Sequence, residues 1–150
     1  MDYEFEALKV QSIIARTLLV RKSKLFGAEG CSLNPDSDIC LTEHCIKAIP
    51  KEKLKEKYKG EFERVWKKLK DAEEETDKLI ITFNNKVIDP KYHLSCGGAT
   101  ENSENVDNNK VVYLRKVLCD HCREMGNQEN IKDITLDELL EKLDIKIKKI

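Results

Sequence analysis

Apolar side chains recur every three or four residues over three stretches of the chain, the spacing expected of one face of a helix. Residues 2–24 contain no glycine or proline and predict a long, well-buried helix. A second helical region is predicted over residues 51–75, interrupted at Gly60. A third, at residues 135–143, starts with Thr135 followed three positions later by Glu138, the pattern of a capping box. The stripe of the first helix is Phe5, Leu8, Ala15, Leu18 and Leu19.

Residues 79–88 instead alternate apolar and polar side chains around Asn84-Asn85, a pair that tolerates the left-handed turn of a short hairpin. Residues 111–117 are apolar enough for a strand or a buried turn. No repeat or linker divides the chain, and 150 residues suffice for one core. We therefore predict one α+β domain over 1–150, with long helices packed around a small antiparallel hairpin.

The hairpin leads into residues 88–106, a polar loop centred on Cys96-Gly97-Gly98. Two adjacent glycines favour a shaped loop over a helix or strand. The loop is rich in hydrogen-bonding groups, which suits binding of a sugar, a phosphate or a partner chain. In the alternative interpretation Tyr92 and His93 only cap and pack the loop. The candidate binding side chains are Tyr92, His93, Ser95, Thr100, Glu101 and Asn102.

Charge distribution narrows the classes of partner. Lys9, Ser12 and Arg16 share one flank of the first helix, which forms either a cationic wall for a polar ligand or a solvated surface. Over the whole chain, 27 Lys and Arg balance 28 Asp and Glu, and 6% of residues are aromatic. This composition argues against nucleic acid as a partner. With no run of about 18 apolar residues and no basic start, we also expect neither a membrane span nor a signal peptide.

Four of the possible metal ligands lie in one loop, residues 27–45, which is rich in glycine, proline and aspartate. Thiolates and imidazole at short loop spacings suit tetrahedral zinc, in which case the ion pins the loop. Because adjacent residues rarely both ligate, we expect His44 or Cys45 to face elsewhere. The alternative is reduced cysteines that pack as small apolar groups. The candidate ligands are Cys31, Cys40, His44 and Cys45.

A further pair, Cys119 and Cys122, has the C-x-x-C spacing of either a zinc site or a redox dithiol. A single such pair leaves both possibilities open. It either joins the first cysteine cluster in space or holds nothing.

Two separated motifs resemble the stage II sporulation protein D (SpoIID) family. EALKVQSIIARTLLVR is similar to the family's signature helix, which reads EALKAQ followed by ART. The hairpin turn Asn85-Lys86 resembles the family's NGK segment, and Tyr113-Leu114-Arg115 its YL segment, so the resemblance covers about residues 1–118. Residues that match the family's loop motif in order are Tyr92, His93, Gly97, Gly98, Thr100, Glu101 and Asn102.

The resemblance implies a lytic transglycosylase that cuts peptidoglycan glycan strands during engulfment of the forespore. It also implies a membrane-anchored protein facing the wall between mother cell and forespore, with other engulfment proteins as partners. A DIC and HC pair like that of clostridial members implies zinc at Cys40 and Cys45, completed by Cys31 or His44. The glycan groove would be lined by Lys9, Ser12, Arg16, Tyr92, His93, Ser95, Gly97, Gly98, Thr100 and Asn102.

The sequence departs from the family pattern at two positions. The family's catalytic glutamate directly precedes the methionine that corresponds to Met1, so it has no counterpart in the printed sequence, and the family's anchor region has none either. Cys96 stands where the family has serine. We therefore expect a truncated core with impaired cleavage, or alternatively a non-catalytic module that binds glycan or a partner protein and carries a structural zinc.

Overall fold

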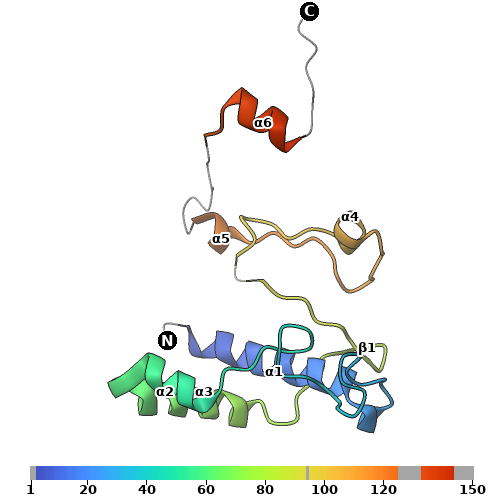
Figure 1. Cartoon of the computed structure of the whole chain (residues 1–150). Helices are drawn as coiled ribbons and strands as arrows, with labels where there is room; N and C mark the ends of the chain where they lie inside the picture. Colours follow the sequence, from blue (N-terminus) through green and yellow to red (C-terminus); the bar gives the residue numbers. More distant parts are fainter. Residues whose placement is uncertain (1–2, 94, 125–132, 144–150) are drawn as a thin grey trace, which may run out of the picture. The chain divides into compact units, whose positions relative to one another are not determined.

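A computed structural model describes residues 3–93, 95–124 and 133–143 (Figure 1). The chain forms two compact units, an N-terminal unit (Met1–Tyr92) and a C-terminal unit (His93–Ile150). Helices together with one small antiparallel sheet confirm the predicted α+β class. The assignment of a single domain to residues 1–150 stays a prediction.

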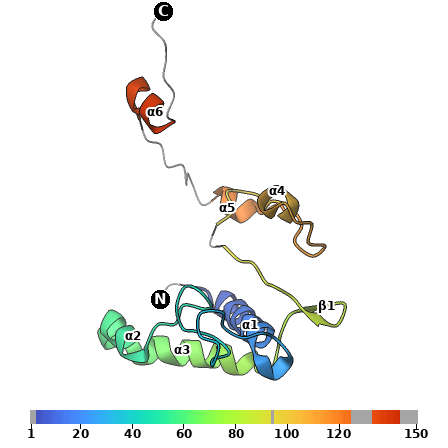
Figure 2. The ribbon, with the colours of Figure 1, turned by 45° about the vertical axis from the view of Figure 1, so that its right-hand side comes forward.

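The N-terminal unit is built on two long helices that lie side by side, α1 (Phe5–Lys22) and α3 (Phe62–Glu75) (Figures 1 and 2). A short 3-10 helix, η1 (Lys24–Phe26), follows α1, and α2 (Lys51–Tyr58) precedes α3. The interruption predicted at Gly60 is the 3-10 turn η2 (Lys59–Glu61). Both helical regions predicted for this unit are thus confirmed.

The core of this unit lies between the helices. The buried apolar side chains are Leu8 and Ile14 of α1, Leu54 of α2, and Phe62, Val65 and Ala72 of α3. The stripe predicted for α1 is wrong at Leu19, which is 37% exposed, whereas Thr17 is fully buried. A polar residue can occupy the core here because its hydroxyl finds partners on two elements.

The buried hydroxyl of Thr17 joins α1 to the chain that enters the hairpin. Its Oγ1 donates to the carbonyl of Ile13 at 2.7 Å and accepts a hydrogen bond from the backbone N–H of Ile81 at 3.0 Å. The first bond is local to the helix, while the second spans 64 residues. Thr17 therefore helps to hold the hairpin against α1, together with Arg21, which donates to the Val87 carbonyl of β2 at 3.3 Å.

The hairpin consists of β1 (Thr82–Phe83) and β2 (Lys86–Val87), paired antiparallel with Thr82 opposite Val87. Asn84 and Asn85 form its turn with φ of 50° and 59°. Positive φ at both central residues is the requirement of a type I′ turn, which asparagine meets at low steric cost. The predicted hairpin and its turn are confirmed.

The C-terminal unit contains α4 (Ser103–Asp107), α5 (Asp120–Glu124) and α6 (Leu136–Lys142). The helix predicted at residues 135–143 is confirmed as α6, and its capping box is complete: Thr135 Oγ1 accepts from Glu138 N–H, and Glu138 Oε2 accepts from Thr135 N–H, both at 3.2 Å. Residues 111–117 form a turn and no strand, and Val112 in it is 66% exposed. A lone bridge pairs Ala99 with Leu118.

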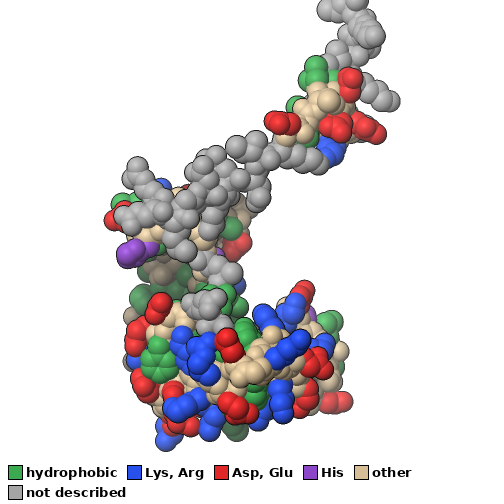
Figure 3. Space-filling view, turned by 90° about the vertical axis from the view of Figure 1, so that its left-hand side faces the viewer, with side chains coloured by type: hydrophobic (Ala, Val, Ile, Leu, Met, Phe, Trp, Pro, Cys, Tyr) green, Lys and Arg blue, Asp and Glu red, His purple; other side chains and the backbone are tan. Residues whose placement is uncertain are grey.

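Charged side chains of both signs are interspersed over the face of the N-terminal unit seen in Figure 3. This mixture agrees with the formal net charge of −1. Of the helices in the described ranges, none is both long and apolar enough to cross a membrane.

Replacing Thr17 tests the link between α1 and the hairpin. Thr17→Val keeps the shape of the side chain but leaves the Ile81 N–H without its acceptor, so we expect a loss of about 1–3 kcal/mol in the free energy of unfolding, measured by urea denaturation. Thr17→Ser retains the hydroxyl and serves as the matched variant, with a smaller loss expected. Equal stability of Thr17→Val and the wild type would contradict this role.

Candidate metal centre and adjoining pocket

The loop that carries the first cysteines, residues 27–45, is folded back onto the end of α1. Asp38 Oδ1 accepts a hydrogen bond from the Lys24 N–H, and the Cys31 N–H donates to the Ser37 carbonyl, both at 3.0 Å. Gly30 has φ of 82°, and a Cβ atom there would lie 2.9 Å from that carbonyl oxygen. The tight turn before Cys31 therefore requires glycine.

All four predicted metal ligands converge in this loop. His44 Nδ1 lies 3.3–3.7 Å from three sulfur atoms, those of Cys31, Cys40 and Cys45. The four ligand atoms all lie within 4.8 Å of one another. Ligands of a tetrahedral zinc ion, at about 2.3 Å for sulfur and 2.0 Å for nitrogen, are separated by roughly 3.6 Å. The group therefore has the dimensions of a tetrahedral metal site.

The expectation that either His44 or Cys45 faces elsewhere is wrong, because Cys45 Sγ lies 3.3 Å from His44 Nδ1. The other ring nitrogen of His44, Nε2, lies 3.1 Å from Ser32 Oγ. A hydrogen bond at that nitrogen fixes the ring orientation that turns Nδ1 toward a metal. Lys22 Nζ lies 3.7 Å from Cys45 Sγ and places a positive charge beside the thiolates.

The thiols differ in how readily they ionise. Hydrogen bonds from the Thr42 side chain and then from His44 lower the pKa of Cys40 to about 5. The backbone N–H of Cys40 lowers the pKa of Cys45, but burial and the neighbouring thiols of Cys40 and Cys31 outweigh it and the net shift is upward. The Cys40 thiol therefore ionises more readily than the Cys45 thiol, and a divalent cation would displace thiol protons on binding.

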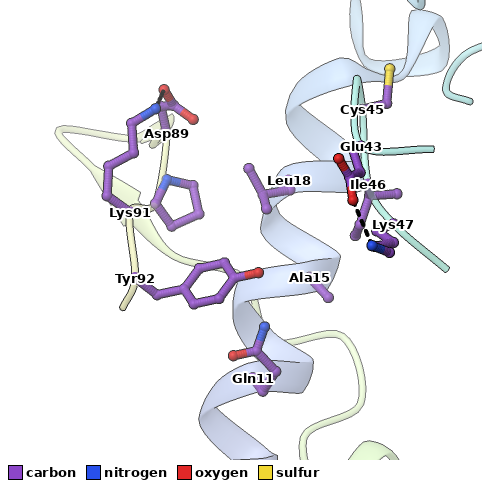
Figure 4. A pocket seen from close by; sticks show the side chains of 11 residues that line it. Gln11, Ala15, Leu18, Glu43, Cys45, Ile46, Lys47, Asp89, Lys91 and Tyr92 are labelled. Atoms are coloured by element: carbon purple, nitrogen blue, oxygen red, sulfur yellow. Dashed lines mark hydrogen bonds and ion pairs between the residues drawn. The ribbon is translucent and has the colours of Figure 1, made fainter. Parts of the chain in front are cut away.

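A cavity of about 490 Å³ lies beside this cluster, within the N-terminal unit. Three segments line it: one flank of α1, residues 43–47 at the end of the cysteine-bearing loop, and the chain after the hairpin (Figure 4). The Tyr92 ring points toward α1, on the side where Gln11 lies. The lining residues are Gln11, Ala15, Leu18, Glu43, Cys45, Ile46, Lys47, Asp89, Pro90, Lys91 and Tyr92.

The pocket combines an aromatic ring with paired charges. Lys91 Nζ lies 2.9 Å from Asp89 Oδ2, and Lys47 Nζ lies 2.5 Å from Glu43 Oε1. Tyr92 is 57% exposed and can contact a ligand with both its ring and its hydroxyl. A volume in the range of about 300–1,000 Å³ is typical of small-ligand sites. The lining of this pocket is rich in charged and polar side chains, which suits a polar ligand.

Gln11 is a pocket residue that the sequence analysis did not single out. Together with Ala15 and Leu18 it follows the i, i+4, i+7 spacing of one helix flank, which is not the flank of Lys9 and Arg16. The available signal was its place as the final residue of the EALKVQ motif.

The predicted cationic flank of α1 has partners within its own unit. Lys9 Nζ lies 3.2 Å from Glu75 Oε2, and Arg16 Nη1 donates to the Thr76 carbonyl at 2.6 Å. These contacts tie α1 to the end of α3, and Ser12 on the same flank is half-buried. A role for these three residues in a glycan groove stays a prediction.

The remaining predicted binding residues belong to the C-terminal unit, where several of them shape their own loop. Thr100 Oγ1 accepts from the Val117 N–H at 2.8 Å, and Asn102 Oδ1 accepts from the Lys116 N–H at 2.9 Å. Gly97 and Gly98 have φ of 65° and 114°, His93 is exposed, and Ser95 is half-buried. Because the candidate residues are divided between the two units, a groove that contains them all stays a prediction.

Arg115 anchors α4 to the segment that follows it. Its guanidinium donates to Glu104 Oε1 at 2.8 Å and to the Val111 carbonyl at 3.1 Å. The hydrogen bond from Arg115 is the main cause that lowers the pKa of Glu104 to about 2. A carboxyl whose pKa is depressed in the folded state stabilises that state above its unfolded pKa, about 4.3 for glutamate, and loses this effect as the pH falls toward 2.

Glu104→Gln should therefore lower the melting temperature at pH 7, with the difference from the wild type shrinking as the pH falls from about 4 toward 2. Thermal unfolding of both proteins over this range measures it. Glu43→Gln is the matched control, because it removes an ion pair whose glutamate side chain is 79% exposed and is screened by solvent. A difference that does not depend on pH would contradict the assignment.

Comparison with known proteins agrees with the motifs. The family model described as Stage II sporulation protein (SpoIID) matches residues 1–83. Stage II sporulation protein D of Bacillus subtilis (strain 168) is 29% identical over 145 residues, 95% of this chain and 41% of that protein. The protein of the same name from Bacillus amyloliquefaciens is 26% identical over 149 residues, 98% and 42% respectively. The chain thus spans about two fifths of the length of these relatives, and by the match to more than half of its residues it belongs to the SpoIID family.

Proposed function

We propose that this chain is the glycan-binding core of a sporulation protein that cleaves peptidoglycan strands as a lytic transglycosylase, acting on the wall between mother cell and forespore. One observation carries the proposal. Gln11, from the motif on α1, and Tyr92, from the motif after the hairpin, line the same pocket although they are far apart in the sequence. The parts of the chain that resemble the family thus meet at a cavity of suitable size for a sugar unit.

The lining of the pocket suits a saccharide. A sugar ring offers hydroxyl groups at its edge and C–H groups on its faces, so it is bound by polar groups together with an aromatic ring. Tyr92 supplies the ring, and Gln11 supplies an amide that can donate and accept. Lys91 and Asp89, paired at 2.9 Å, add a donor and an acceptor at the same rim.

Cleavage of a glycosidic bond in this way needs one carboxylic acid that first protonates the bridging oxygen and then takes the proton of the sugar's own hydroxyl. The pocket carboxylates Glu43 and Asp89 each form a salt bridge with a lysine, so their oxygens are already engaged by protein groups. Neither is the residue to which the proposal gives the role of the acid. We assign it to the glutamate that the family resemblance places directly before Met1.

A second candidate function is binding without cleavage. It is favoured by the salt bridges that engage both pocket carboxylates, Glu43 and Asp89, with lysines. The chain as printed is then expected to hold a glycan strand, or a protein of the engulfment machinery, without turnover.

We further propose that the cluster of Cys31, Cys40, His44 and Cys45 holds one structural zinc ion. Four protein ligands close the coordination sphere, which is the arrangement of structural sites and leaves no position for substrate. Cys45 belongs to both the cluster and the pocket. The ion would therefore hold in place the pocket wall that contains Glu43, Ile46 and Lys47.

Adding a glutamate before Met1 separates the two candidate functions. The chain is extended by Met-Glu before Met1, or by Met-Gln as the control, and incubated with denuded glycan strands; anhydro-sugar ends are then sought by mass spectrometry. We expect products only from the Glu extension. In that background Tyr92→Ala should weaken glycan binding roughly fivefold, about 1 kcal/mol, while the exposed Tyr3→Ala should not.

Binding without products from the Glu-extended chain would leave the non-catalytic module as the function. Absence of both binding and products would overturn the proposal for this pocket.

Loss of the first cluster should remove zinc and loosen one loop before it unfolds the helices. We expect the double variant Cys40→Ser, Cys45→Ser to contain one zinc ion fewer than the wild type by elemental analysis, and to be cut by protease within residues 27–45 while α1 and α3 persist. Ser32→Ala, which touches only His44 Nε2, should retain the ion with lowered affinity. Unchanged zinc content and melting temperature in the double variant would contradict the zinc site and show that these cysteines only pack as small apolar groups.

A further inference from the structure

The three cysteines outside the first cluster lie close together in the C-terminal unit. The sulfur atoms of Cys96, Cys119 and Cys122 all lie within 4.8 Å of one another. The Cys119 and Cys122 sulfurs are 3.4 Å apart. This distance is well beyond the roughly 2.05 Å of a disulfide bond. It is close to the roughly 3.8 Å that separates two thiolates on a tetrahedral zinc ion.

The backbone that carries these cysteines is held by paired hydrogen bonds. Ala99 and Leu118 form an antiparallel bridge, and next to it the Cys119 N–H donates to the Gly98 carbonyl at 2.9 Å. Positive φ at Gly97 and Gly98 turns the chain after Cys96 into this pairing. The bridge brings residues more than twenty positions apart into register, so the three thiols converge through the fold and not through sequence proximity alone.

Backbone amides also point at the sulfur atoms. The Cys122 sulfur accepts a hydrogen bond from the Cys96 N–H and lies beside the Ser95 hydroxyl. The Cys96 sulfur in turn accepts a hydrogen bond from the Gly98 N–H. Donors of this kind are typical partners of metal-bound thiolates, where they stabilise the charge on sulfur.

The first cluster has the same local arrangement. There the Thr42 N–H donates to the sulfur of Cys40, two residues earlier, as the Gly98 N–H does to the sulfur of Cys96. Both turns thus present an amide to the sulfur of a cysteine that begins them. The hydroxyl of Ser95 is buried beside Cys122 and has no other partner among the described residues.

We propose that Cys96, Cys119 and Cys122 form a second metal site, distinct from the first, that binds a thiophilic divalent ion such as zinc. This proposal does not depend on the glycan function. It favours zinc over a redox dithiol for the C-x-x-C pair, and it differs from the expectation that the pair joins the first cluster or holds nothing, because the pair combines with the cysteine of the Gly-Gly loop. That cysteine stands where the family pattern has serine.

The second site differs from the first in its coordination. No fourth cysteine, histidine, aspartate or glutamate among the side chains described, those of residues 3–93, 95–122 and 133–143, belongs to this group. Three thiolates leave one position of a tetrahedral ion for an exchangeable ligand such as water. The ion would fasten the Gly-Gly loop to the start of α5 and thereby order the loop that contains Thr100 and Asn102.

The experiment counts metal ions in the full-length chain purified under reducing conditions. We expect about two zinc ions per wild-type chain, and about one in each of two matched double variants. One variant is Cys119→Ser with Cys122→Ser, and the other is Cys40→Ser with Cys45→Ser. Replacement by cobalt should give thiolate charge-transfer absorption in both variants, since each retains one cluster. Cys96→Ser should also lose one ion.

A measurement on the wild type tests the proposal even if the variants fail to fold. Alkylation followed by mass spectrometry should find Cys96, Cys119 and Cys122 protected with zinc bound and reactive after chelation. The proposal would be overturned if the wild type bound only one zinc ion and the Cys119→Ser, Cys122→Ser variant kept that ion. It would equally be overturned by alkylation of these three thiols that zinc does not alter, or by a disulfide between Cys119 and Cys122 in the reduced preparation.

Discussion

The N-terminal unit depends on the convergence of three sulfur atoms on one imidazole nitrogen. The loop of residues 27–45 runs between α1 and α2, and of its side chains Cys31 alone is in the buried core. Such a loop removes little apolar surface from water, so burial offsets little of the entropy lost on ordering it. Hydrogen bonds accepted by Asp38 and by the Ser37 carbonyl fix its start, while the cluster of three cysteines and His44 fixes its end. The fixed end of the loop positions the pocket wall that continues beyond Cys45.

Elements governed by short-range rules could be predicted from the sequence. The hairpin turn followed from two asparagines that accept positive φ, and the start of α6 from a threonine and a glutamate three residues apart. The buried face of α1 was harder, because periodicity identifies apolar positions but not a threonine whose hydroxyl bonds to Ile81, 64 residues away. Burial of Thr17 is a tertiary property that no local pattern encodes.

The candidate site shows the same contrast between features set by local sequence patterns and features set by tertiary contacts. Ligand chemistry and close spacing identified all four residues of the first cluster, and the adjacent pair of His44 and Cys45 proved compatible with one centre. Gln11 was missed because the helix pattern alone could not tell which flank of α1 faces a cavity. The grouping of Cys96 with the C-x-x-C pair depends on the bridge from Ala99 to Leu118, a contact between segments that spacing does not predict.

The central claim is that a metal ion holds the loop that forms one wall of the pocket. Hydrogen exchange of the zinc-loaded and chelated protein, resolved by peptide, tests it most directly. The account predicts that chelation speeds exchange in residues 31–47, while amides of α1 and α3 stay protected because their packing around Val65 and Leu8 does not involve the ion. Unchanged exchange in residues 31–47 after complete removal of the metal would contradict it.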